Sequence, residues 1–328
     1  MRLVIQTYGA NLSLDSGMIV IETDDTRREV SLLHVTSIHI QTNARISTAL
    51  IEACMNGQIP VFFENDMHIT ALIWSPRYGS FARIRRQQAL FSLSRLRFRL
   101  IRQILINKNT ERLRWLRKHT RRPENLERMA RIEQINEQIR QAPDEADKIR
   151  SLEAHASKIY FRILNDMLPQ AFRFDKRTYR HSRDPFNIML NYAYGMLYNL
   201  ITKALIHAGL DPDIGFFHAV QYNRPALAYD IIENYRPWVE HWLYILIKSG
   251  TLEPLMPVVD EEGRLRTEPK RALIEHIFNQ WENTRIRHKN RTRSPMNHIY
   301  LDAQDLARYI LNLDTDLILK HIDPNPKP

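Results

Sequence analysis

The amino-acid sequence changes its pattern near residue 80, and this change constrains the fold more than any other feature. Before that point, short runs such as MIVIET and EVSLLHVTSIHIQ are rich in β-branched residues and partly alternate with a period of two, which predicts β-strands. Asp15-Ser16-Gly17 separates two such runs and is a hairpin turn signal. The exception is STALIEACMN, residues 47–56, which predicts a short helix that ends at Gly57, before the buried-strand pattern IPVFF.

After Pro76 the periodicity becomes helical and stays helical. Asp184-Pro185 predicts an N-cap followed by proline at the first helical position, and Gly209 predicts the C-cap of the same helix. The residues between them are apolar almost all round, which places this helix at the centre of a helical domain. We therefore predict an α+β protein, with a small β-rich N-terminal domain (residues 1–80) and a large all-α C-terminal domain (residues 81–328).

Composition excludes several classes of protein. Of 328 residues, 44% are hydrophobic and 26% are charged, which is typical of a globular chain and not of a disordered one. No run approaches the roughly 18 consecutive apolar residues that a membrane span needs, so we expect no membrane association. Cys54 is the only cysteine, which excludes an internal disulfide and a thiolate metal cluster. A reducing, cytoplasmic setting is expected.

The net charge of +10 is concentrated in one segment. Residues 83–122 contain 14 Lys and Arg and a single acid, Glu111, so the segment carries 14 − 1 = +13 and the rest of the chain carries 10 − 13 = −3. Such a basic segment favours a polyanionic partner such as nucleic acid; the alternative is a solvated helix face. The spacings of Arg95, Arg99 and Arg102 would place these three arginines on one helical face. A second basic run, residues 285–293, is either a nucleic-acid contact or a mobile loop.

Four acidic or imidazole side chains are candidates for chemistry. Glu153 lies among small residues in SLEAHASKIYF, although it could be an ordinary surface residue. His218 ends GLDPDIGFFH, where it could equally be a core histidine. Asp230 and Glu233 stand three apart on one face of an otherwise apolar helix. Because burying unpaired carboxylates is costly, these two need a cation.

The cation could come from the protein or from solution. Arg224 or Arg236 could form a structural salt bridge with these acids, or a metal could bind them. Pro237 should end or kink the helix that carries them. The sequence contains no GxxxxGK[ST], GxGxxG, GxSxG or HExxH motif, so phosphate binding through a glycine-rich loop is not expected.

Three motifs in order resemble the CRISPR-associated integrase family, the universal spacer-acquisition nuclease (CRISPR-associated protein one). GLDPDIGFFH followed by NRPALAYDIIENYRP resembles the most characteristic stretch of the family. LEAHASKIYF is similar to its first acidic motif, and Asn187, Tyr192 and Tyr194 in FNIMLNYAYGMLYN match its central helix. The resemblance covers the whole chain and is specific from about residue 150 to residue 240.

The resemblance implies a metal site and a reaction. Glu153, His218 and Glu233 would be ligands of Mg²⁺ or Mn²⁺, with Asp230 as a supporting acid. The implied reaction is transesterification, in which the 3′-OH of a short DNA fragment attacks a phosphodiester at the CRISPR repeat boundary. Departures from the family pattern are modest: Ala154 follows the first Glu, Phe217 precedes the His, and a Glu240-His241 pair fills a later acidic position.

The resemblance also implies partners. The protein would be a homodimer through its β-rich domains, would assemble with a small companion, CRISPR-associated protein two, and would bind double-stranded DNA as both fragment and repeat. The residues expected to contact DNA are Arg83, Arg95, Arg99, Arg102, Asn187, Tyr194 and Arg224. Two other functions stay open at this point: a non-catalytic nucleic-acid-binding scaffold, in which the acids only pair with arginines, and a plain hydrolytic metallonuclease.

Overall fold

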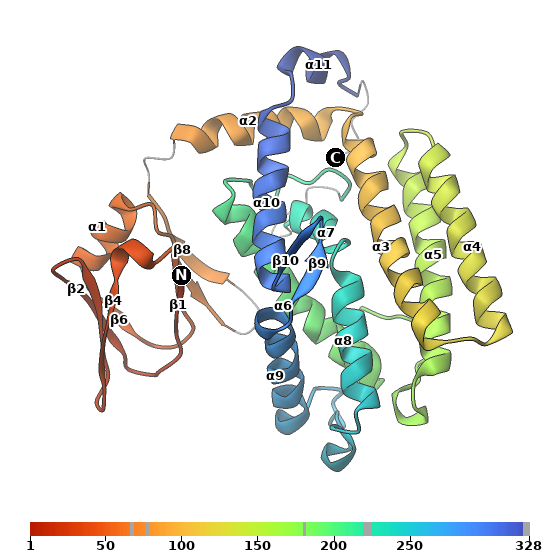
Figure 1. The fold of residues 1–328 in the computed structure, drawn as a ribbon, viewed down its shortest axis with the longest axis horizontal. Coiled ribbons are helices and arrows are strands. Elements are labelled where there is room, and N and C mark those ends of the chain that lie inside the picture. The colour runs from red at the N-terminus through yellow and green to blue at the C-terminus, as the bar shows by residue number, and fades with distance from the viewer. Residues whose placement is uncertain (66–68, 76–78, 180–181, 219–224, 324–328) are drawn as a thin grey trace. The chain divides into compact units, whose positions relative to one another are not determined.

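The structure is a computed structural model of the chain, and it describes residues 1–65, 69–75, 79–179, 182–218 and 225–323. The chain divides into two compact units, Met1–Ala82 and Arg83–Pro328. The first is rich in strands and the second is mostly helical (Figure 1), which confirms the α+β class expected from the sequence. The boundary between the units lies close to the change of sequence pattern near residue 80.

The N-terminal unit contains two four-stranded sheets, with strand orders β1-β5-β7-β8 and β4-β3-β2-β6. The β2–β3 hairpin turns at Ser16 and Gly17, whose φ angles are 49° and 79°. Two successive positive φ angles are what a type I′ hairpin turn requires, so the turn expected here is confirmed. The strands are β1 (Arg2–Ile5), β2 (Asn11–Asp15), β3 (Met18–Glu22), β4 (Arg27–Ser31), β5 (Ser37–Ile40), β6 (Arg45–Ile46), β7 (Val61–Glu64) and β8 (Ile69–Ile73).

One helix completes this unit. Helix α1 (Thr48–Asn56) begins after Ser47, whose hydroxyl accepts a hydrogen bond from the N–H of Leu50. Leu50 and Cys54 of α1 are fully buried in the core that the strands supply. Burial raises the pKa of the Cys54 thiol to about 11, so this cysteine stays protonated and is a core residue.

The C-terminal unit is built from ten helices among the residues that the structure describes. Within it, α3, α4 and α5 pack side by side (Figure 1). None of these helices combines the length and the apolar character that crossing a membrane would need. They are α2 (Gly79–Leu93), α3 (Arg97–His119), α4 (Pro123–Gln141), α5 (Ala146–Met167), α6 (Pro185–His207), α7 (Ala226–Ile232), α8 (Arg236–Lys248), α9 (Thr267–Asn283), α10 (Pro295–Leu311) and α11 (Thr315–Lys320).

Helix α6 is the centre of the C-terminal unit. Its N-cap is Asp184, whose carboxylate accepts the N–H of Asn187, and Gly209 follows its end with φ 84°. The N-cap was expected from the sequence, whereas the C-cap is Ala208, one residue before the predicted Gly209. The helix contacts α7, α8, α9 and α10 and buries residues on all sides. It therefore supplies the core against which the helices of the site pack.

A short β-hairpin interrupts the helical pattern expected for the C-terminal unit. Strands β9 (Ile286–His288) and β10 (Arg291–Arg293) pair antiparallel around Lys289 and Asn290, which both have positive φ. Lys289 and His288 are bonded to Asp302 of α10, each at 2.9 Å. The second basic run is thus an ordered hairpin tied to α10.

Candidate active site

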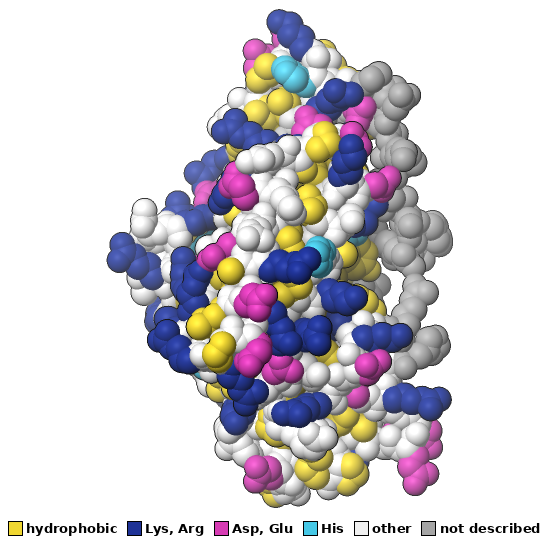
Figure 2. Space-filling view, turned by 90° about the vertical axis from the view of Figure 1, so that its right-hand side faces the viewer, with side chains coloured by type: hydrophobic (Ala, Val, Ile, Leu, Met, Phe, Trp, Pro, Cys, Tyr) yellow, Lys and Arg dark blue, Asp and Glu magenta, His cyan; other side chains and the backbone are white. Residues whose placement is uncertain are grey.

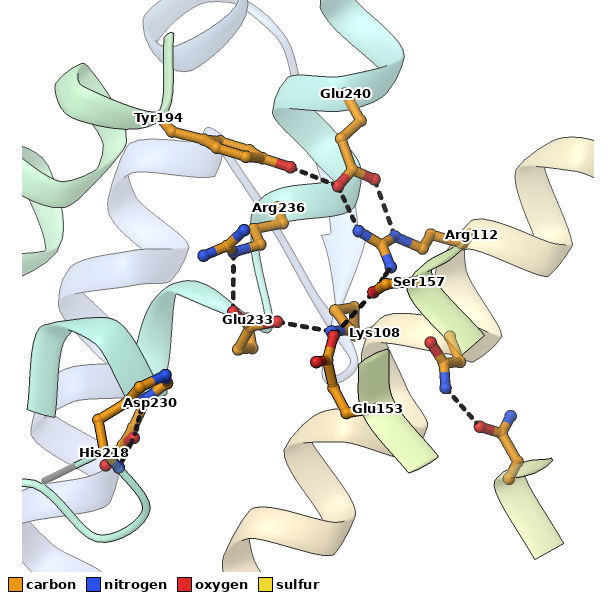
Figure 3. Close-up of polar contacts among 12 residues, drawn as sticks. Lys108, Arg112, Glu153, Ser157, Tyr194, His218, Asp230, Glu233, Arg236 and Glu240 are labelled. Atoms are coloured by element: carbon orange, nitrogen blue, oxygen red, sulfur yellow. Dashed lines mark hydrogen bonds and ion pairs between the residues drawn. The ribbon is translucent and has the colours of Figure 1, made fainter. Parts of the chain in front are cut away.

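Polar side chains, most of them charged and largely buried, meet inside the helical unit. Pairs of them lie one turn apart on α3 and on α5, so each pair points the same way, and the others come from α6 and from the α7–α8 junction (Figure 3). The side chains are Lys108 and Arg112 from α3, Glu153 and Ser157 from α5, Tyr194 from α6, and Glu233, Arg236 and Glu240 from the α7–α8 junction.

The chain turns sharply between α7 and α8. Helix α7 ends at Ile232, and Pro237 lies in the first turn of α8, where its missing N–H leaves no helical hydrogen bond unmade. Pro237 therefore marks the interruption that the sequence predicted. Glu233 lies in this turn, and its side chain points toward α3 and α5 (Figure 3).

Lys108 joins two of the predicted metal ligands. Its ammonium donates to Glu153 Oε1 at 2.5 Å and to Glu233 Oε2 at 2.6 Å. The Lys108 side chain is 1% exposed, against 22% for Glu153 and 11% for Glu233. Glu233 also forms an ion pair with Arg236, one of the alternatives that the sequence left open, with an N–O distance of 2.8 Å. Two carboxylates, one from α5 and one from the α7–α8 turn, thus converge on one buried cation.

Both carboxylates are held in their ionised form. Burial raises the pKa of a carboxylic acid, but the Lys108 ammonium outweighs burial at Glu153 and lowers its pKa to about 2. Burial acts in the same direction on Glu233, where Arg236 and Lys108 lower the pKa below its usual value. At neutral pH the pair is therefore a doubly negative, partly desolvated site of the kind that needs a cation.

Glu240 anchors a second buried ion pair beside the first. Arg112 donates to both of its carboxylate oxygens, at 2.9 and 2.5 Å, and Tyr194 Oη donates at 2.5 Å. Arg112 also donates to Ser157, whose hydroxyl donates to Glu153 at 2.7 Å. Glu240, whose role the sequence left open, therefore supports the position of Glu153 through Arg112 and Ser157.

His241, the other member of the Glu240-His241 pair, faces a different environment. Its ring stacks on Trp115, with ring centroids 4.3 Å apart. Burial lowers the pKa of its imidazole to about 3, so this histidine is neutral at physiological pH. It belongs to the aromatic packing between α3 and α8.

Asp230 holds the loop that carries His218. Its carboxylate accepts the backbone N–H groups of Phe216, Phe217 and His218 at 2.5 to 3.0 Å. His218 Nδ1 lies 2.7 Å from Asp230 Oδ1, and because that carboxylate acts as an acceptor, we assign the proton to Nδ1. A Cβ on Gly215 would lie 2.7 Å from the Cβ of Ala226, so the loop can approach α7 this closely only with glycine at that position.

The carboxylate oxygens of this site suit a divalent cation. Glu153 and Glu233 supply the oxygen ligands that Mg²⁺ and Mn²⁺ prefer, and the ammonium between them marks a position for positive charge. Asp230 engages Nδ1 of His218, so Nε2 is the ring nitrogen that this contact does not use. Within the described ranges, no three His, Cys, Asp or Glu side chains are close enough to hold one metal. The structure therefore brings the two glutamates together and leaves His218 beside Asp230.

The basic segment 83–122 is not one continuous exposed surface. Arg97, Lys108 and Arg112 are buried, and the last two serve the carboxylates described above. Other members are exposed but ion-paired, such as Arg114 with Glu111. On the face that Figure 2 shows, basic and acidic side chains are interspersed. The expected exposed stripe is therefore divided by a buried middle part.

The arginines expected to bind DNA differ in exposure. Arg83, Arg95 and Arg99 are exposed, whereas the Arg102 side chain is 17% exposed and donates to Asp144 and to the carbonyl of Ala142, both at 2.6 Å. Arg95 precedes the first residue of α3. The prediction that Arg95, Arg99 and Arg102 share one helical face is therefore wrong.

Two other residues expected to contact DNA lie in the interior, and one lies outside the described residues. Asn187 is fully buried and bonds Asp184, Arg177 and the carbonyl of Lys176. Tyr194 is 3% exposed and donates to Glu240. Neither side chain is accessible to a DNA backbone in this structure. Arg224 is outside the described residues.

A cavity of about 770 Å³ opens beside Glu153. Its lining combines cationic and aromatic side chains, which suit phosphate groups and bases of nucleic acid, and it also includes the acids Asp166 and Asp175. The sequence did not indicate it, because its walls come from α5 and from the segment after that helix. The residues that characterise the lining are Lys158, Arg162, Lys176, Arg177, Phe161 and Tyr179.

Lys108 was not among the predicted site residues, although α3 carries a signal for it. Phe98, Ile101 and Leu105 form the apolar stripe of this helix, and Lys108 and Arg112 continue the stripe at spacings of three and four. A lysine and an arginine in the buried stripe of a helix need buried acidic partners. This position in the apolar stripe distinguishes Lys108 and Arg112 from the exposed arginines of the same basic segment.

Comparison with known proteins identifies the family. The family model described as CRISPR associated protein Cas1 matches residues 3–279. A Thermus thermophilus protein named CRISPR-associated endonuclease Cas1 1 is 30% identical over 322 residues, which cover 95% of this chain and 96% of the relative. The fold is similar to a chain of the partial Cas6-RT-Cas1–Cas2 complex (TM-score 0.74, 22% identity, 97% of both chains). It is also similar to a casposase bound to integration product (TM-score 0.69, 19% identity, 96% of this chain and 97% of the other). The chain belongs to the CRISPR-associated Cas1 family.

Proposed function

We propose that this protein is a divalent-metal-dependent DNA endonuclease and integrase of CRISPR adaptation, which inserts short DNA fragments into a repeat array. The observation that carries the proposal is the convergence of Glu153 and Glu233, which are far apart in sequence, on one buried cation position. The family supports it, because the Thermus relative is named an endonuclease. The casposase bound to integration product supports it at the level of fold.

The proposed reaction exchanges one phosphodiester for another. The 3′-hydroxyl of the fragment attacks the phosphorus at the repeat boundary, and a bond forms between its oxygen and the phosphorus. The bond from phosphorus to the 3′-oxygen of the cut strand breaks; the attacking hydroxyl releases its proton to solvent, and the departing oxygen takes one up. A Mg²⁺ or Mn²⁺ ion held by Glu153, His218 and Glu233 would lower the pKa of the attacking hydroxyl and offset charge on the phosphate oxygens.

The protein supplies positioning through its own contacts. Asp230 keeps the proton of His218 on Nδ1, so that Nε2 can act as a ligand. Arg236 engages one oxygen of Glu233 and so orients the other toward the shared cation position. The Ser157 hydroxyl donates to Glu153 Oε1, the same oxygen that Lys108 contacts, and so holds this oxygen at the shared cation position. The cavity beside Glu153 would take the DNA strand, with its cations on the phosphates.

The proposal includes partners that follow from the family. Double-stranded DNA would serve as fragment and as repeat, with Arg83, Arg95 and Arg99 on the phosphate backbone. A companion of the Cas2 type is supported by the Cas6-RT-Cas1–Cas2 complex, whose chain has this fold. The protein would be a homodimer through its β-rich unit.

One observation favours a second candidate, a non-catalytic DNA-binding scaffold. Lys108 and Arg236 satisfy the charges of Glu153 and Glu233 within the protein, as a purely structural role for these acids would require. A hydrolytic nuclease is the third outcome, and it differs from an integrase in its products.

A joining assay separates the three functions. Purified protein with its companion is incubated with a labelled fragment and a repeat-containing duplex, in Mn²⁺ and in EDTA. We expect lengthened, joined strands in Mn²⁺, none in EDTA, and none with Glu233→Gln. Glu275→Gln, an exposed acid paired with Arg271, is the matched control and should join strands normally. Shortened strands alone would indicate hydrolysis, and unchanged strands under all conditions would indicate a scaffold.

A further inference from the structure

Lys108 occupies the position that joins the two glutamates, and it differs from the other buried cations around it. Arg112 is fixed by two hydrogen bonds to Glu240 and lies over the ring of Tyr160, 4.2 Å from its centroid. Arg236 pairs with Glu233, donates to Tyr198 and lies over Tyr194. Both guanidinium groups therefore have partners besides the shared cation position.

The hydrogen bonds of Lys108 go to the two glutamates. Within the described part of the chain, its ammonium contacts Glu153 and Glu233 and no third acid. A lysine ammonium is a point charge on a flexible four-carbon stem, unlike the planar fork of arginine. Of Lys108, Arg112 and Arg236, Lys108 is therefore the one that can leave its position without breaking a bidentate pair or a ring contact.

Two cations cannot share this position. The ammonium lies 2.5 and 2.6 Å from one oxygen of each carboxylate, within the range of metal–oxygen bonds, about 2.0–2.6 Å. A divalent ion bound to both carboxylates would need the same oxygens or the same space, and it would repel the ammonium at close range. Without any cation, the two carboxylates would repel each other inside the protein.

We propose that Lys108 is the resident counter-cation of the Glu153–Glu233 pair: it holds the two carboxylates together before metal binding and gives up its position to the divalent ion. This inference rests on the proposed function, because it takes both glutamates as metal ligands. Lys108 is then a positioning residue. Its withdrawal is a cost that metal binding must overcome, so the apparent metal affinity is lower than the two carboxylates alone would give.

The test is metal affinity in the full-length protein, measured by titration calorimetry with Mn²⁺ alone. Lys108→Met removes the competing charge and keeps the length of the side chain, and we expect Mn²⁺ to bind about 10-fold more tightly, as for a site that is about one-tenth available in the wild type. The metal-free variant should melt at a lower temperature than the wild type, and saturating Mn²⁺ should restore most of that difference.

Lys158→Met is the matched control. Lys158 is an exposed lysine that lines the same cavity as Glu153, so its removal changes the general electrostatics without vacating the shared position. We expect its Mn²⁺ affinity to change less than about 2-fold, because exposed charges are screened by solvent. An equal gain in both variants would show a nonspecific charge effect and would contradict the proposal.

A measurement on the wild type does not depend on the folding of a variant. Lys108 is almost fully buried, so acetic anhydride should label it slowly in the metal-free protein. With saturating Mn²⁺, the labelling of Lys108 relative to exposed lysines should rise by about 10-fold, in line with its displacement. Unchanged labelling in Mn²⁺ would show that the ammonium stays in place, and would overturn the proposal.

The outcomes separate this inference from the proposed function. If the wild type binds Mn²⁺ and Lys108→Met binds it equally or less tightly, Lys108 does not compete, and the inference fails while the metal mechanism stands. If neither the wild type nor Lys108→Met binds Mn²⁺, both fail together.

Discussion

At the scale of single residues, Asp230 organises more of the site than a supporting acid would need to. Its fully buried carboxylate accepts three successive backbone N–H groups and orients the His218 ring. The residue thus joins the stability of the 215–218 loop to the tautomer of a proposed metal ligand. A change at this one carboxylate should affect both properties.

Asp230→Asn should therefore lower both stability and metal affinity. An amide has one acceptor oxygen where the carboxylate has two, so some N–H groups are left without an acceptor, at a cost of about 1–3 kcal/mol. Because His218 is then no longer oriented, Mn²⁺ binding should weaken about 10- to 100-fold. Thermal denaturation and calorimetry measure the two effects.

His218→Ala is the matching control for this prediction. The His218 side chain is 41% exposed, so this variant should lose Mn²⁺ affinity while keeping its melting temperature nearly unchanged. Wild-type Mn²⁺ affinity in Asp230→Asn, together with weak binding in His218→Ala, would show that the carboxylate does not orient the imidazole.

At the scale of elements, the middle and the start of α3 differ in burial and in function. Its middle turns Lys108 and Arg112 inward to the carboxylates, while Arg99 near its start is exposed. The formal charge of the segment therefore overstates what is available to a polyanion. Of the arginines in residues 83–122, only the exposed ones should contribute to DNA binding.

The salt dependence of DNA binding tests this division. Replacing Arg83, Arg95 and Arg99 together by Ala should make the log–log slope of affinity against salt shallower by about one for each phosphate that is no longer neutralised. The effect should be the same on unrelated duplexes, because phosphate contacts carry no sequence information. Fluorescence anisotropy at several salt concentrations gives the slope.

The control for the salt experiment removes three exposed arginines from other places. Arg140, Arg264 and Arg271 are each more than half exposed and paired with nearby acids, so their replacement should leave the slope unchanged. A slope equally altered in both triple variants would mean that net charge, and not the exposed part of this basic segment, sets DNA affinity.

Local sequence signals predicted most helices and strands well, but they did not predict the buried ion pairs around Lys108. The β2–β3 turn and the N-cap of α6 depend on neighbouring residues, so Asp15-Ser16-Gly17 and Asp184-Pro185 suffice to place them. The partners of Lys108 lie 45 and 125 residues away. The apolar stripe of α3 indicates which face is buried, but tertiary packing decides that α5 and α8 cover it, and no local pattern reports these partners.

The resemblance to a family identified Glu153, His218, Asp230 and Glu233, but it could not show what surrounds them. The role of Asp230 in holding the 215–218 loop and the inward turn of Tyr194 became visible only in the structure. The same holds for the hairpin β9–β10. Its basic run has the composition of a loop, and its order depends on contacts with Asp302.

At the scale of the whole molecule, the proposed homodimer has a candidate contact in the β-rich unit. Leu33 is 93% exposed and Tyr8 is 77% exposed, and a partner that covered them would remove this apolar surface from water. Leu33→Glu should place a charge in such an interface and shift the protein toward monomer. Sedimentation equilibrium at micromolar concentration would show the mass fall by about half if the proposed dimer forms.

Leu126→Glu is the control for the dimer experiment. Leu126 is 45% exposed on α4 of the helical unit, so this change adds the same charge away from the β-rich unit. Its mass should equal that of the wild type. Dimers that persist in Leu33→Glu but dissociate in Leu126→Glu would place the interface on the helical unit instead.

The central claim is that Glu153 and Glu233 share one metal. A crystal structure of the protein with Mn²⁺, with the ion located by its anomalous scattering, tests this most directly. We predict one anomalous peak about 2.0–2.3 Å from an oxygen of each carboxylate, with His218 Nε2 as a further ligand and Lys108 moved away. Absence of a peak at saturating Mn²⁺, with Lys108 still bonded to both glutamates, would contradict the account.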